Sequence, residues 1–267
     1  MNTVTSRDGT RIAYDKRGTG PALILVDGAF CHRGFGPMPK LAEVLSDKYT
    51  VYNYDRRGRG DSADTKPYSV EKEIEDLTAI FDAAGGSAFL YGVSSGAALA
   101  LRAAGSGLAV RKLALYEPPF ALDGYHTPRP ADFREQIAGM VRNNQRDDAV
   151  KLFMRVVGVP AFGIFMMRMM RGVWKKLVNV AHTLLYDFAV LGDTQRGGTL
   201  PDDLRALAGS ISVRTLAMSG SKSPEWMRHA ADVVASVVQN GSTRVLPGQT
   251  HNVSAKAVEP ALREFFV

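Results

Sequence analysis

One segment of 12 residues, FLYGVSSGAALA at 89–100, constrains the fold of this chain more than any other. A β-type run leads into Gly92-x-Ser94-x-Gly96, and small helix-forming residues follow. A serine at such a tight strand-to-helix turn adopts a strained backbone, and the flanking glycines remove side chains that would collide there. The turn raises the Ser94 hydroxyl above a sheet and leaves the amide of Ser95 free to donate to an oxyanion. The segment predicts a nucleophilic serine, the alternative being an ordinary Gly/Ser turn.

Two blocks of the chain alternate between strand and helix patterns. Continuous apolar or β-rich runs are typical of strands buried on both faces of a parallel sheet. Strands are expected at 11–16, 21–26, 49–54, 88–91, 110–116, 213–219 and 243–246, and helices at 70–84, 97–104, 224–238 and 253–266. Between the blocks, residues 120–210 show helical periods and no strand pattern. We therefore expect one α/β domain, residues 1–119 and 211–267, with a helical insertion at 120–210.

Composition excludes several classes of protein. The single cysteine, Cys31, excludes an intramolecular disulfide and a multi-cysteine zinc site. The net charge of +6 is not gathered into Lys/Arg-rich blocks and accompanies no nucleic-acid motif, so we expect no nucleic-acid partner. The longest apolar run, 156–167, is too short to cross a bilayer, and residues 1–14 lack the apolar segment of a signal peptide. We expect a cytoplasmic protein without a metal site.

Four motifs, in order along the chain, resemble those of the α/β-hydrolase superfamily. They are DGAF at 27–30, DRRGRGDS at 55–62, the G-x-S-x-G turn at 92–96 and PGQTHN at 247–252. The resemblance covers nearly the whole chain outside the insertion. It implies an α/β-hydrolase fold, with a mostly parallel central sheet flanked by helices and a helical cap inserted after the sixth strand. The chain departs from the family at Asp27, where a histidine is usual. We interpret Asp27 as a structural acceptor for loop amides.

The resemblance also implies roles for residues around Ser94. His251, in the final loop, would take the Ser94 proton and later protonate the leaving group. The amides of Ala29 and Ser95 would form the oxyanion hole. The remaining histidines are more typical of surface or packing residues: His32, His126, His182 and His229.

The acid partner of His251 departs from the family's usual place. The usual aspartate follows the seventh strand in a G-x-x-D turn, where this chain has Ser223. Some members take the acid from the end of the sixth strand, where this chain has Glu117. A carboxylate at the end of a buried strand is costly without a partner, so we predict Glu117 as the orienting acid. Glu225 is the first alternative, and a purely structural role for Glu117 is the second.

Methionines, aromatic residues and basic residues are concentrated in the insertion. Five of the ten methionines lie between 153 and 174, and no acidic residue occurs from 149 to 186. This part can form the core of the cap or a dimer contact, an adaptable apolar pocket, or a basic apolar surface that touches lipid. The pocket interpretation selects these residues as substrate-binding: Phe30, His32, Met154, Phe162 and Met166.

A serine nucleophile directs the expected chemistry. Because residue 94 is serine rather than aspartate, acyl transfer is favoured over alkyl-enzyme chemistry. We expect a cofactor-independent serine hydrolase, monomeric or homodimeric, acting on small to medium apolar esters or lactones through an acyl-enzyme. Alternatives that keep the triad are thioesterase, amidase, C–C bond hydrolase and perhydrolase chemistry. Alternatives of another class are a ligand-binding protein with little turnover and a lyase or cyclase.

Overall fold

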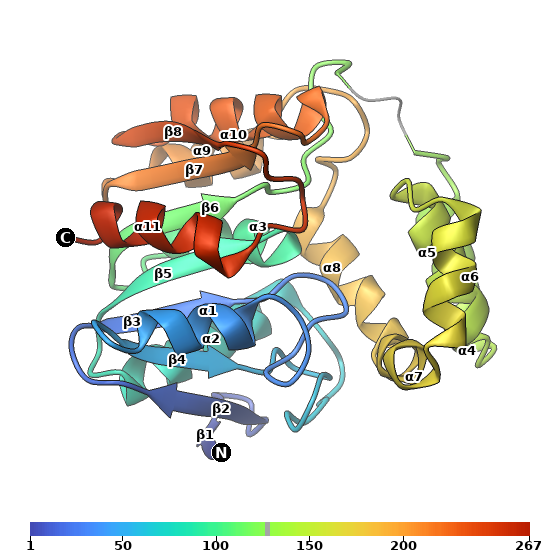
Figure 1. Cartoon of the computed structure of the whole chain (residues 1–267), viewed down its shortest axis with the longest axis horizontal. Coiled ribbons are helices and arrows are strands. Elements are labelled where there is room, and N and C mark those ends of the chain that lie inside the picture. Colours follow the sequence, from blue (N-terminus) through green and yellow to red (C-terminus); the bar gives the residue numbers. More distant parts are fainter. Residues whose placement is uncertain (126–128) are drawn as a thin grey trace.

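A computed structural model of the chain describes residues 1–125 and 129–267 (Figure 1). Its centre is an eight-stranded sheet in the order β1-β2-β4-β3-β5-β6-β7-β8. The strands are β1 (Asn2–Thr5), β2 (Arg11–Arg17), β3 (Ala22–Val26), β4 (Thr50–Tyr54), β5 (Ala88–Val93), β6 (Val110–Tyr116), β7 (Thr215–Gly220) and β8 (Gly241–Leu246). The β1–β2 and β2–β4 pairs are antiparallel, and all neighbouring pairs from β4 to β8 are parallel. The parallel strands bring their carboxyl ends to one edge, where ligands bind in open α/β sheets.

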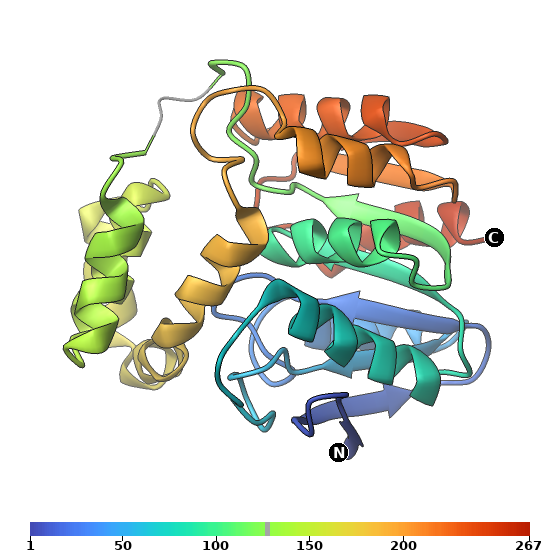
Figure 2. The ribbon, with the colours of Figure 1, turned by 180° about the vertical axis from the view of Figure 1, so that it is seen from behind.

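Helices cover both faces of this sheet (Figures 1 and 2). One face carries α1 (Met38–Leu45) and α11 (Ala255–Phe265), and the other carries α2 (Val70–Ala83), α3 (Ser95–Gly105), α9 (Asp202–Gly209) and α10 (Glu225–Val237). Successive residues of β3 alternate between the two layers: Leu23 and Leu25 pack toward α1, and Ile24 and Val26 pack toward α3. Because both faces are covered, the central strands β3 and β5 carry no charged or strongly polar side chain, as the sequence pattern predicts.

The remaining helices form a cap beside the carboxyl edge of the sheet (Figure 1). They are α4 (Phe133–Arg142), α5 (Arg146–Val156), α6 (Ala161–Met169), α7 (Arg171–Asn179), a short 3-10 helix (Ala181–Thr183) and α8 (Leu184–Leu191). Their apolar side chains form a third cluster, which also includes Phe30 from the loop after β3. Helix α9 lies in the insertion by sequence, but its Leu204 and Ala208 pack into the core cluster with α3. The boundaries 120–210 of the cap as a domain stay a prediction.

The structure contains two elements that the sequence pattern does not indicate. Strand β1 is polar and pairs only with β2 at the sheet edge, so it has no alternating apolar signature. Helix α1 is only eight residues long and follows Pro37 in a segment rich in Gly and Pro. Among the described residues, no helix has the length and apolar character needed to cross a membrane.

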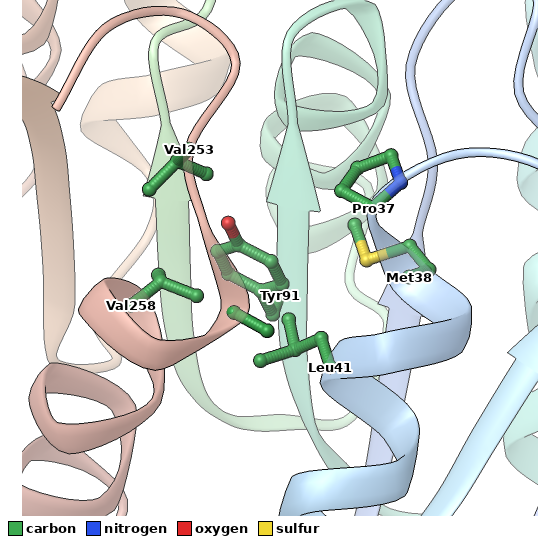
Figure 3. A pocket seen from close by; sticks show the side chains of 7 residues that line it. Pro37, Met38, Leu41, Tyr91, Val253 and Val258 are labelled. Carbon is green, nitrogen blue, oxygen red and sulfur yellow. The ribbon is translucent and has the colours of Figure 1, made fainter.

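A small apolar pocket lies between α1, α11 and β5 (Figure 3). Tyr91 of β5 stands in its centre, and Met38 and Val258 approach it from the two helices. Val253, two residues after His251, closes one side. The side chains that line the pocket pack together and support the loop after β8, which carries His251.

Candidate active site

Ser94 lies at the turn between β5 and α3 with a strained backbone. Its φ of 56° and ψ of −128° are sparsely populated for a residue with a side chain. A Cβ on Gly92 would lie 2.5 Å from the carbonyl oxygen of Gly96, and a Cβ on Gly96 would lie 2.4 Å from that of Val26. Larger residues at either position would push the helix away from the sheet. The amide of Ser94 donates to the carbonyl of Tyr116 at 2.9 Å, which holds the turn on β6.

A continuous hydrogen-bonded relay joins Ser94, His251 and Glu117. The Nε2 atom of His251 lies 3.1 Å from the Ser94 hydroxyl oxygen, and its Nδ1 lies 2.8 Å from Oε2 of Glu117. Glu117 is completely buried, and its other oxygen accepts from the amide of Gly220 at 2.7 Å. Both carboxylate oxygens therefore have donors. With the Nδ1 proton directed at Glu117, the imidazole presents Nε2 as the acceptor for the Ser94 proton.

The structure brings Glu117, and not Glu225, against His251. Glu225 is exposed at the first residue of α10. Ser223 is buried in the turn after β7. Glu117 itself has a φ of 46°, so its backbone, like that of Ser94, is held in a region that L-residues rarely adopt.

Other histidines have partners away from Ser94. They are His32 with the amide of Gly34, His182 with Asp64, and His229 with Asp123. Burial lowers the pKa of His32 below its ordinary value, and the nearby Lys176 and Arg33 act in the same direction. The remaining candidate, His126, lies outside the described residues.

The loop after β3 passes directly beside the serine. A Cβ on Gly28 would lie 2.9 Å from the Cβ of Ser94, so only glycine allows this approach. The amides of Ala29 and Ser95 donate to no other described residue, so both are available to a ligand. Nη1 of Arg59 donates to the carbonyl oxygen of Gly28 at 2.6 Å. Because the peptide unit is planar and trans, holding this carbonyl also fixes the direction of the Ala29 N–H.

A buried carboxylate from the cap, Asp187 of α8, anchors this arrangement. Its Oδ1 accepts from Arg59 at 2.8 Å, from Arg56 at 2.8 Å and from the Ser95 hydroxyl at 2.7 Å. Burial alone would raise the pKa of Asp187, but attraction by Arg59 and Arg56 outweighs it and lowers the pKa. No motif in the sequence indicates Asp187. The available signal is a single acidic residue in an otherwise apolar helix, directly after the acid-free stretch 149–186.

Asp27, the departure from the family pattern, is almost completely buried under the same loop. Its Oδ1 accepts from the amide of Gly28 at 3.2 Å, as the interpretation of a loop acceptor expects. Burial raises the pKa of this carboxyl group to about 7, although the nearby Arg59 acts in the opposite direction. The group is therefore partly protonated near neutral pH.

The five expected substrate-binding residues fall into different environments. Phe30 is buried and meets the edge of the Phe153 ring of α5 at 5.2 Å between centroids. Met154 packs against the same cap cluster, and His32 lies partly buried beside Phe35. Phe162 and Met166 on α6 are 73% and 46% exposed. The structure thus brings Phe30 and Met154 into one apolar cluster and leaves Phe162 and Met166 outside it.

Solved structures share this architecture. An α/β hydrolase from Sphaerobacter thermophilus DSM 20745 is 46% identical, and the alignment covers 100% of both chains with a TM-score of 0.91. A thermophilic esterase from Thermogutta terrifontis is 21% identical over 99% of this chain and 97% of its own, with a TM-score of 0.69. The enol-lactonase from Burkholderia xenovorans LB400 is 17% identical over the same shares, with a TM-score of 0.70. At these lower identities the likeness shows the fold alone.

Sequence comparison gives a consistent result. The uncharacterized hydrolase YraK of Bacillus subtilis (strain 168) is 29% identical over 163 residues, which is 55% of this chain and 55% of that protein. The chain thus spans about half the length of this relative. The model of the alpha/beta hydrolase family matches residues 23–260, which include the strand-to-helix turn at Ser94 and the loop that carries His251. Together with the fold, this match shows that the chain belongs to the alpha/beta hydrolase family.

Proposed function

We propose that the protein is a serine hydrolase in which Ser94, His251 and Glu117 form a catalytic triad. The observation that carries the proposal is the relay of 2.8 and 3.1 Å from Glu117 through His251 to Ser94. The amides of Ala29 and Ser95, which donate to no described residue, lie on the segments that flank the serine. This combination is what acyl transfer requires: an activated nucleophile, a base held in one orientation and donors for an oxyanion.

The reaction follows from this geometry. His251 takes the Ser94 proton through Nε2 while the serine oxygen attacks the substrate carbonyl. The amides of Ala29 and Ser95 donate to the oxyanion of the tetrahedral intermediate. The imidazolium, stabilised by Glu117, then protonates the leaving group, and an acyl-serine remains. Water, deprotonated by His251, attacks this ester, and collapse of the second intermediate releases the acid and restores the Ser94 hydroxyl.

Small to medium apolar esters or lactones are the proposed substrates. The first residue after the Ala29 amide is Phe30, whose ring meets Phe153 from the cap. Phe133 and Phe188 continue this aromatic cluster. Apolar rings beside a few polar groups are the usual composition of a small-molecule site, and they suit an apolar chain on the acyl or alcohol side.

Turnover of p-nitrophenyl acetate, butyrate and octanoate tests the proposal. Wild type should hydrolyse at least one of these esters, and Ser94→Ala and His251→Ala should each lower kcat by several orders of magnitude, since triad members act as a unit. Parallel amide and thioester substrates show whether the ester is the preferred bond. Folded wild-type protein that turns over none of them, or variants as active as wild type, would contradict the proposal.

A further inference from the structure

Arg129 is a mostly covered cation in the segment that leads from β6 to α4. Its Nη1 donates to Oε1 of Gln195 at 3.0 Å, and its guanidinium carbon lies 5.8 Å from the centre of the Phe133 ring. Its Nε is buried and donates to no described residue. The guanidinium therefore retains a hydrogen-bond donor that the described part of the protein does not use.

The charge of Arg129 is also uncompensated. Three fully buried arginines pair with carboxylates: Arg56 with Glu73 and Asp187, Arg57 with Asp76, and Arg59 with Asp187. No carboxylate of the described residues lies within ion-pair distance of Arg129, and the adjacent residues 126–128 are His, Thr and Pro. A partly buried cation without a counter-ion is destabilised, and an anion from outside the chain would relieve this cost.

The nearest charge increases this imbalance. Burial lowers the pKa of Arg129 to about 10, and the neighbouring Arg134 acts in the same direction. The group still carries its charge at neutral pH. Arg134 has a structural role of its own, because it donates to the carbonyl of Gly192 at the C-terminal end of α8. Of these two arginines, Arg129 is therefore the one whose guanidinium remains available to a ligand.

Two routes of contact connect Arg129 with the reacting groups. Gln195, which accepts from Arg129, donates through Nε2 to the carbonyl of Pro119 at 3.1 Å, two residues after Glu117. On the other side, the Phe133 ring below the guanidinium lies 6.5 Å from that of Phe153. Phe153 in turn meets Phe30, the residue after Ala29. Aromatic rings therefore extend from Phe30, in the loop after β3, to the Arg129 guanidinium.

We propose that Arg129 binds the carboxylate of an anionic substrate, an ester whose apolar chain ends in a carboxylate. The reacting carbonyl lies at Ser94, the chain follows the rings of Phe30 and Phe153, and the carboxylate pairs with Arg129. Half-esters of medium-chain dicarboxylic acids have this chemistry. The inference rests on the proposed hydrolase function and adds the substrate class. A carboxylate with a guanidinium forms charge-assisted, often bidentate hydrogen bonds, which use the free donor.

A matched pair of substrates tests this subsite. Mono-p-nitrophenyl suberate carries the far carboxylate, and its methyl ester has the same chain without the charge. Wild type should prefer the anionic ester by about tenfold or more in kcat/KM, as expected for a hydrogen bond to a charged group. Arg129→Gln should remove this preference mainly by raising KM for the anionic ester, and should lower kcat/KM for the anionic ester more than for its methyl ester. Arg196→Gln is the control, because Arg196 is exposed on the same loop as Gln195 and pairs with Asp193.

Two results would overturn the inference. Wild type could hydrolyse both esters equally, or Arg129→Gln could lower both to the same extent, which would indicate a structural role. A binding measurement separates this failure from failure of the proposed chemistry. Calorimetry with suberate on Ser94→Ala needs no turnover, and it should show binding that Ser94→Ala with Arg129→Gln loses. Suberate binding without any ester turnover would support the anion site and refute the hydrolase mechanism, whereas turnover without a charge preference would do the reverse.

Discussion

The guanidinium of Arg59 donates to the carbonyl oxygen of Gly28 at 2.6 Å and so fixes the peptide that carries the Ala29 N–H. The same guanidinium donates to Asp187 of the cap at 2.8 Å. The buried Arg59 side chain therefore links the loop after β3 to α8. The direction of an oxyanion donor thus depends on a residue that makes no contact with the reacting atoms.

Arg59→Gln should lower kcat more than it changes KM, because the Ala29 amide loses its fixed direction. Deleting an oxyanion donor outright costs about 10²- to 10³-fold, and a disoriented donor should cost less, about 10- to 100-fold. Arg57→Gln is the control. Arg57 is equally buried, but it pairs with Asp76 and Asp8. It should lower Tm without lowering kcat of the folded enzyme, and an equal kcat loss in both variants would show that Arg59 acts through stability alone.

Glu117→Gln should lower kcat by about 10²- to 10⁴-fold, because an amide cannot stabilise the imidazolium of His251 as a carboxylate does. Glu225→Gln should leave kcat at the wild-type value, since Glu225 is exposed on α10. The measurement is kcat for the best p-nitrophenyl ester. Full activity of Glu117→Gln would transfer the orienting role to another group.

Asp27→Asn should change how stability depends on pH. Burial raises the pKa of Asp27 from 3.8 to about 7. Between pH 3.8 and about pH 7 its carboxyl group is therefore protonated in the native state and ionised in the unfolded state. The contribution of Asp27 is therefore fully present below pH 3.8 and is lost as pH rises to about 7, at about 1.4 kcal/mol for each pKa unit. Urea unfolding at pH 4 and pH 8 should show the variant gaining stability relative to wild type at the higher pH. A constant difference would refute this.

The exposed apolar side chains of α6 predict contact with an anionic lipid surface. They are Phe162, Phe165, Met166 and Met169, at the i, i+3, i+4 and i+7 positions of one helix face. Exposed Arg168 and Arg171 flank them, and these charges disfavour pairing of this face with a second copy. The protein should co-sediment with anionic vesicles, less so at high salt, and not with zwitterionic ones.

A double variant tests this surface. Phe162→Ser with Met169→Ser should abolish vesicle binding and leave Tm unchanged, because both side chains are already exposed. If the variant sediments as wild type does, the helix face is not the contact. A concentration-dependent dimer that the variant loses would assign the face to self-association instead.

Local geometry explains how much of the site could be predicted from sequence. Gly92 and Gly96 remove two clashes within a few residues of Ser94, so the strand-to-helix turn is encoded in one short segment. Glu117 could be selected as the neighbour of His251 because the family resemblance points to the end of the sixth strand and a carboxylate there needs a partner. Its neighbour His251 is 134 residues away, and only the shared carboxyl edge of the parallel strands brings the two together.

Other parts of the site depend on tertiary contacts that no local pattern encodes. Asp187 reaches Ser95 across 92 residues, from a helix whose sequence shows only an acid among apolar side chains. In the sequence, Arg129 does not differ from other loop arginines. Its buried, unused Nε and the absence of a described carboxylate nearby are visible only in the structure. The exposure of Phe162 depends on which face of α6 packs on its neighbours, and a helix as uniformly apolar as α6 does not indicate that face.

Intact-mass labelling with a fluorophosphonate tests most directly whether Ser94 is activated by His251 and Glu117. Wild type should gain a single adduct, which maps to Ser94, and Ser94→Ala should gain none. His251→Ala keeps the hydroxyl without the base and should label far more slowly. Folded wild-type protein that takes up no adduct, or an adduct that persists in Ser94→Ala, would contradict the proposed triad.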